Sequence, residues 1–253
     1  MTILKGERAM KIRDIFALAL TITLLNSMSF ATLKVGIIHN DGEINVFRNS
    51  LLQYNDFEQI DLINWNSTPD PVEIAKYDSV IVTTAYKPVA NSKQWGDIIA
   101  DYAEAGGGVV LGFAFFSTNG PVVDYGKLEN PLHSPFSRGP LMDGYGSLGN
   151  ILLPSNPIMS GVTELTTRYR YDVTVNTGAS VVASFYGGIP LAGFMDVGSG
   201  RVVGIQACYV LNPYFTNEGD YMQLYRNAAV YSVPEPCSVL LFGLGCLVLR
   251  KRR

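Results

Sequence analysis

Short apolar runs alternate with segments of helical periodicity over the first half of the chain. Apolar side chains recur at every third or fourth position in 44–54 and 92–105, which is the spacing of an amphipathic helix. Strand–helix–strand units are joined by right-handed crossovers and give a parallel sheet covered on both faces. We therefore predict one α/β domain with a mostly parallel sheet. The predicted strands are 33–38, 57–65, 77–84 and 109–114.

The second predicted helix has signals at both ends. Ser92 is expected to cap its first turn, and three glycines, Gly106 to Gly108, are expected to stop it, as C-capping glycines do. These glycines precede a strand and lack a neighbouring lysine, so they do not form a phosphate-binding loop.

Polar side chains follow several predicted strands at their carboxyl ends, where open α/β sheets hold their ligands. A serine there could attack an ester or a glycan acyl group if a histidine reached it as base, which leaves a hydrolase as one hypothesis. The alternative, which we favour, is that these are hydrogen-bonded loop residues. The residues expected to border this crevice are His39, Asp41, Thr83, Thr84 and Ser117.

The N-terminus has the pattern of a secretory signal peptide. Lys11 and Arg13 form a basic region, residues 15–25 form an apolar segment, and Ala31 ends a stretch suited to signal peptidase. We predict a signal helix over 1–31 and a mature chain that begins at Thr32. The basic region is unusually long, so translation could begin at Met1 or at Met10.

The C-terminus combines a proline-flanked motif, an apolar run over 238–249 and a basic end. Prolines keep the motif extended, and basic residues resist translocation and stay cytoplasmic. The motif consists of Val233, Pro234, Glu235 and Pro236, and the basic end of Arg250, Lys251, Arg252 and Arg253.

This arrangement resembles the PEP-CTERM sorting signal, whose motif is cut by a membrane peptidase called an exosortase. The resemblance covers 233–253 and implies export through the inner membrane, transient anchoring by a hydrophobic sorting helix, and delivery to the cell surface or an exopolysaccharide matrix. A plain membrane anchor is the alternative, but such a span normally needs roughly twenty apolar residues.

Composition indicates a packed domain over 32–232. Only 16% of residues are charged, and the net charge of −3 gives no basic surface for nucleic acid. Cys237 and Cys246 lie in the tail, so Cys208 is alone in the mature domain and is expected to be a core residue. Metal-ligand spacings are missing from the sequence, and we predict neither a metal nor a cofactor.

Several motifs of the mature chain resemble the class I glutamine amidotransferase-like superfamily, in the branch with trehalose-utilisation-type proteins. The resemblance implies a flavodoxin-like three-layer sandwich. The matching segments are 77–82, 98–112, 156–161, 200–204 and 221–231, and Asn156 stands where that branch usually has histidine.

The catalytic residues of that superfamily are not found. The elbow after the central strand, which should hold a cysteine, offers Phe115 and Phe116, and 207–212 lacks the expected histidine. We therefore predict no amidotransferase activity.

The segment 117–160 is irregular and carries interspersed aromatic residues, with a further group at 169–172. Tyr125, Phe136 and Tyr145 could stack on sugars, or they could pack a loop. His133 lies between prolines and is expected to be exposed. Three functions remain open: a non-catalytic module that binds glycan or protein, a hydrolase at Ser117 and His39, and a purely structural surface protein.

Overall fold

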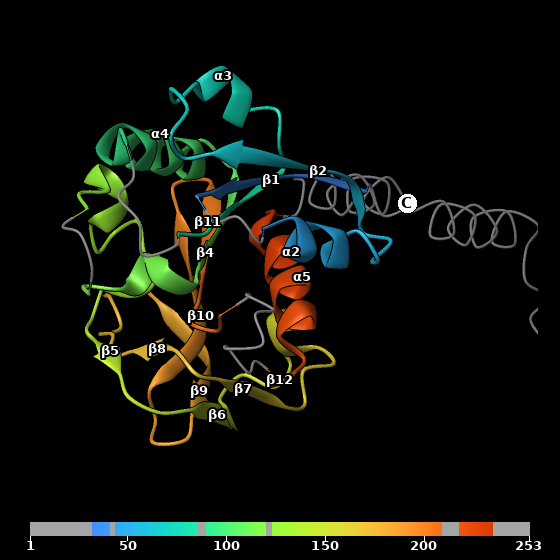
Figure 1. The fold of residues 1–253 in the computed structure, drawn as a ribbon, viewed down its shortest axis with the longest axis vertical. Coiled ribbons are helices and arrows are strands. Elements are labelled where there is room, and N and C mark those ends of the chain that lie inside the picture. Colours follow the sequence, from blue (N-terminus) through green and yellow to red (C-terminus); the bar gives the residue numbers. More distant parts are fainter. Residues whose placement is uncertain (1–31, 41–43, 85–89, 120–122, 209–217, 235–253) are drawn as a thin grey trace, which may run out of the picture. The chain divides into compact units, whose positions relative to one another are not determined.

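The computed structural model describes residues 32–40, 44–84, 90–119, 123–208 and 218–234. Their main feature is a ten-stranded sheet of order β12-β7-β6-β9-β10-β11-β4-β3-β1-β2 (Figure 1). Its strands are β1 (Leu33–His39), β2 (Phe57–Asn64), β3 (Ser79–Val82), β4 (Gly108–Gly112), β6 (Gly146–Ile151), β7 (Leu165–Thr167), β9 (Ser180–Phe185), β10 (Pro190–Val197), β11 (Gly200–Ile205) and β12 (Glu218–Gly219). A separate pair joins β5 (Leu141–Met142) to β8 (Arg170–Tyr171).

The mixed α/β architecture predicted from the sequence is confirmed. Strands β2, β1, β3, β4 and β11 run parallel, and β3 and β4 are buried along their whole length. The predicted strands 33–38, 77–84 and 109–114 correspond to β1, β3 and β4, which lie at the centre of this parallel part. From β10 onward the sheet continues in antiparallel fashion, because its strands are joined by hairpins and loops instead of crossover helices.

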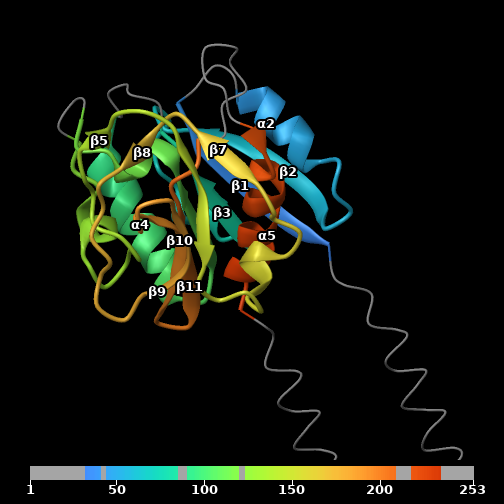
Figure 2. The same ribbon diagram turned by 90° about the horizontal axis from the view of Figure 1, so that it is seen from below.

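Helices cover both faces of the parallel part (Figures 1 and 2). One face carries α2 (Ile44–Leu51) and α5 (Tyr221–Ser232), and the other carries α3 (Pro71–Ile74) and α4 (Ser92–Glu104). As the spacing predicts, α2 buries Ile44, Phe47 and Leu51. The result is the three-layer arrangement of a flavodoxin-like fold.

The ends of α4 differ in part from expectation. The N-cap is Asn91, which has a left-handed backbone (φ 56°) and makes no side-chain cap bond, so the predicted Ser92 cap is wrong. Asparagine tolerates this conformation better than most residues. The predicted stop is confirmed, since the chain turns at Gly106 with φ 114°.

The described residues also form three short 3₁₀ helices: η1 (Phe113–Phe116), η2 (Gly126–Glu129) and η3 (Pro157–Met159). Asn156 caps η3, and its Oδ1 accepts a hydrogen bond from Ile158 N at 3.0 Å. The side chain of Asn227 in α5 donates to Ile158 O and Ser160 O and so holds this turn. Asn156 therefore has a structural use at the position where the resembling branch has histidine.

Replacing Asn156 by alanine is expected to reduce the free energy of unfolding by about 1 kcal/mol, because η3 loses its cap. Asn156→Asp keeps an acceptor at Oδ1 and is expected to stay close to the wild type. Urea denaturation of both variants checks this, and equal losses in the two would contradict the capping role.

Among the described residues, no helix is both long and apolar enough to cross a membrane. The predicted signal peptide with Ala31, and the tail from Glu235 to Arg253, lie outside the described residues. Val233 and Pro234 are the described part of the sorting motif, and both are half-buried.

Candidate functional site

The predicted crevice residues lie at the carboxyl edge of the parallel strands, but most of them are buried. His39 ends β1 and is half-buried, whereas Thr83, Thr84 and Ser117 are at most 3% exposed. Asp41 lies outside the described residues. Trp65 links the main chains of His39 and Thr83. Its backbone N donates to His39 O, and its indole Nε1 donates to Thr83 O.

Ser117 belongs to a local turn. Its Oγ donates to Asn119 O at 2.9 Å and accepts from Asn119 N at 3.0 Å. Its carbonyl oxygen accepts two hydrogen bonds from the Arg138 guanidinium. A hydroxyl held in this way resembles an ST-turn more than a nucleophile paired with a base.

Buried aromatic rings occupy the space beside these residues. Each is at most 2% exposed, and each lies within 6 Å of another, from 5.0 Å for Phe115–Tyr125 to 5.8 Å for Trp65–Trp95. Their polar atoms are also satisfied: Trp95 Nε1 donates to Trp65 O at 2.9 Å. We call this group the aromatic plug. Its members are Trp65, Trp95, Phe115, Phe116, Tyr125 and Phe136.

The phenol of Tyr125 is part of the same buried region. Burial raises its pKa to about 12, and a hydrogen bond with Thr84 opposes that rise. Tyr125 is therefore neutral at ordinary pH. Thr84, which was expected to border a crevice, instead contacts the plug.

The aromatic residues of the irregular segment pack a loop, and Tyr145 alone of the three named above stays exposed. Tyr125 and Phe136 are core residues, whereas Tyr145 is 54% exposed. Tyr171 is also fully buried. Of the two interpretations of 117–160, the packed loop is the one that these side chains follow.

The expectation that His133 is exposed is wrong. It is 9% exposed, and its Nε2 lies 2.7 Å from Glu104 Oε1. Glu104 ends α4 nine residues after Trp95, about 14 Å along the helix. The partner of His133 is therefore at the carboxyl end of α4, whereas Ser117 bonds to Asn119 and Arg138. The buried position predicted for Cys208 is confirmed at 1% exposure, just after the end of β11.

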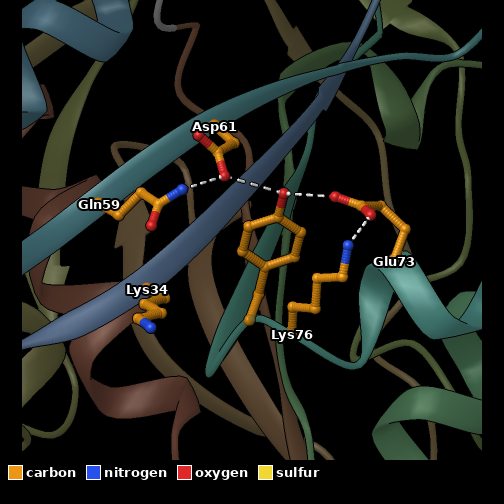
Figure 3. Close-up of a pocket in the computed structure, with 6 residues that line it drawn as sticks. Lys34, Gln59, Asp61, Glu73 and Lys76 are labelled. Atoms are coloured by element: carbon orange, nitrogen blue, oxygen red, sulfur yellow. Dashed lines mark hydrogen bonds and ion pairs between the residues drawn. The ribbon is translucent and has the colours of Figure 1, made fainter.

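A polar hollow of about 290 Å³ opens at the amino edge of the parallel strands. The side chains come from the start of β1, from β2 and from the connection through α3 to β3 (Figure 3). They are Lys34, Gln59, Asp61, Glu73, Lys76 and Tyr77.

Hydrogen bonds link most of these side chains into a row. Gln59 Nε2 donates to Asp61 Oδ2 at 2.6 Å, and Tyr77 Oη lies 3.1 Å from the same oxygen and 3.3 Å from Glu73 Oε1. Lys76 Nζ pairs with Glu73, which raises the pKa of the lysine. Burial, followed by the hydrogen bond to Asp61, raises the pKa of Tyr77 well above its usual value, so this phenol also stays neutral.

The hollow offers amide, carboxylate and ammonium groups, which suit hydrogen bonding to hydroxyl groups. Sequence reasoning missed it because its residues come from three separate elements and are of types common on any surface. The only available signal was the placement of Gln59 and Asp61 on alternate positions of a predicted strand. In the part of the chain that the structure describes, no three His, Cys, Asp or Glu residues gather to hold a metal ion.

Comparison with known proteins shows which solved structures share the fold of this chain. No protein-family model matches the sequence, and a search of curated proteins finds no match. The chain is similar to the cytoplasmic protein STM1381 from Salmonella typhimurium LT2, with a TM-score of 0.62 and 13% identity over 79% of this chain and 100% of that one. The likeness is one of fold alone.

Two further solved structures agree with it. A ThuA-like protein from Parabacteroides merdae has a TM-score of 0.55 and 14% identity over 80% of this chain and 90% of that one. A ThuA-like protein from Bacteroides uniformis has a TM-score of 0.53 and 13% identity over 81% and 93%. These likenesses are also of fold alone, and they agree with the flavodoxin-like architecture described above.

Proposed function

We propose that this chain is an exported, non-catalytic α/β domain that an exosortase sorts to the cell surface or an exopolysaccharide matrix, where it has a binding or structural role. Secretion machinery and signal peptidase would act at Ala31, and the inner membrane would hold the tail until it is cut. The motif at 233–236 and the basic end at 250–253 support the sorting part of the proposal.

The aromatic plug is the observation that supports the absence of catalysis in this proposal. Covalent catalysis needs a nucleophile, a base within hydrogen-bond reach and donors for the oxyanion, all around one open space. Phe115 and Phe116 follow β4 where a nucleophile would stand, and their rings are buried against the other plug residues. A substrate carbonyl has no room there without unfolding part of the core.

Hydrolysis at Ser117 and His39 is the alternative. It is supported less well, because the Ser117 hydroxyl is buried and hydrogen-bonded to Asn119. Catalysis at this position would require the turn to open and an imidazole to replace the main-chain partners.

A binding role has a place in the polar hollow. Gln59, Asp61 and Lys34 present hydrogen-bonding groups of both kinds, as the hydroxyls of a matrix glycan require. This site would recognise its ligand through hydrogen bonds, since the Tyr77 side chain that lines it is only 7% exposed.

Assays of residues 32–232 test the absence of catalysis. We expect no turnover of glutamine, chromogenic esters or chromogenic glycosides above the uncatalysed rate, for the wild type and for Ser117→Ala alike. Turnover that Ser117→Ala abolishes would establish the hydrolase alternative.

A glycan array tests the binding role. We expect binding to a polar glycan that Asp61→Asn reduces, because the substitution removes one charge and one acceptor from the hollow. Asp143→Asn makes the same chemical change at an exposed site in another part of the domain and should leave binding unchanged. Binding that is equal in both variants would exclude the hollow, and no binding at all would favour the structural role.

A further inference from the structure

The first strand and the last helix of the domain each form a hydrogen bond with one of two consecutive residues, Asp78 and Ser79. Lys34 N donates to Asp78 Oδ2 at 2.8 Å, and Ser232 Oγ lies 2.8 Å from Ser79 Oγ. Asp78 and Ser79 enter β3 at its amino end. The beginning of β1 and the end of α5 therefore lie on the same side of the domain, the amino edge of the parallel strands (Figure 2).

The end of α5 is held firmly in this place. Ser232 is fully buried, and a Cβ on Gly108 would lie only 2.5 Å from its Oγ. At the preceding residue, the Arg201 guanidinium donates to Tyr231 O at 3.2 Å and lies 4.5 Å from the centre of the Tyr231 ring. The point at which the chain leaves the domain is thus fixed up to Ser232.

The link from this exit to the apolar run is short. The run begins at Ser238, six residue steps after Ser232, and six steps span at most about 20 Å. A domain of this length is roughly 40 Å across. The link between Ser232 and Ser238 is therefore shorter than the domain is wide. If the apolar run lies in a bilayer, only the edge of the domain at which α5 ends can approach that bilayer.

We propose that, in the uncut chain, the amino edge of the parallel strands faces the bilayer surface and the carboxyl edge with the aromatic plug faces away from it. This inference rests on the proposed function, because it requires the tail to enter a membrane. The polar hollow lies on that edge and would face the bilayer until the tail is cut.

Cysteine labelling of the membrane-bound chain tests this orientation. Ser67, after β2, is exposed at the carboxyl edge, and Ser199, before β11, is exposed at the amino edge. Ser67→Cys and Ser199→Cys are made in the full chain with Cys237→Ser and Cys246→Ala, in a host without an exosortase. Spheroplasts are treated with a bulky PEG-maleimide, and the parent without an added cysteine gives the background from buried Cys208.

We expect Ser67→Cys to react several-fold faster than Ser199→Cys on the membrane, and the two to react at similar rates in detergent. Equal rates on the membrane, or faster reaction of Ser199→Cys, would overturn the orientation while leaving the sorting proposal intact. Recovery of the chain in the soluble fraction would overturn the membrane role of the tail, and the orientation with it.

Discussion

Replacing Phe116 by alanine is expected to reduce the free energy of unfolding of residues 32–232 by about 3–5 kcal/mol, as large-to-small changes of buried aromatic residues do. Phe116 is fully buried and lies 5.4 Å from Phe115 and 5.6 Å from Phe136, measured between ring centres. Its ring also reaches the sheet, because a Cβ on Gly204 would lie 3.0 Å from its Cζ. Removing it leaves a cavity that the fixed strands cannot close.

Urea denaturation measures this loss, and Tyr145→Ala is the matched control. Tyr145 is also aromatic but 54% exposed, and its replacement is expected to change stability by less than about 1 kcal/mol. If Phe116→Ala were no more destabilising than Tyr145→Ala, the plug would not be a packed part of the core. The carboxyl edge would then be open to a ligand, and the hydrolase alternative would gain support.

Much of the fold could be predicted because its signals are local. The three-and-four spacing of Ile44, Phe47 and Leu51 gives the buried face of α2 directly. The all-apolar run of β4 follows from burial on both faces of a parallel sheet. The antiparallel extension was missed as a feature, since strands such as β6 contain glycine and polar residues and resemble loop sequence.

The state of the candidate site depends on contacts between distant residues. Tyr125 and Phe136 have the sequence surroundings of a binding loop, yet they are buried by Trp65 and Phe116 from other parts of the chain. His133 lies in a loop segment, but it is covered because Glu104 ends a helix beside it. A single sequence gives the residue types of such a loop and does not give the partners that bury them.

The second prediction with a large expected effect concerns the sorting motif in the tail. In a host with an exosortase, Glu235→Ala or Pro236→Ala is expected to leave an uncut precursor in the membrane fraction, whereas the wild type is cut and leaves it. The resemblance to a sorting signal implies that the peptidase reads this motif, and Pro236 also keeps the chain extended for it. Immunoblots of fractionated cells measure the change, because the uncut chain keeps the residues up to Arg253.

Glu218→Ala provides the control for the loss of a glutamate, because Glu218 is exposed in β12 and lies outside the motif. It is expected to be processed like the wild type. Unchanged processing of the motif variants would instead make 233–253 a plain anchor. The domain would then keep its amino edge near the bilayer permanently, since the short link after Ser232 would never be cut. The two results therefore separate a domain released to the surface or matrix from one that stays at the membrane.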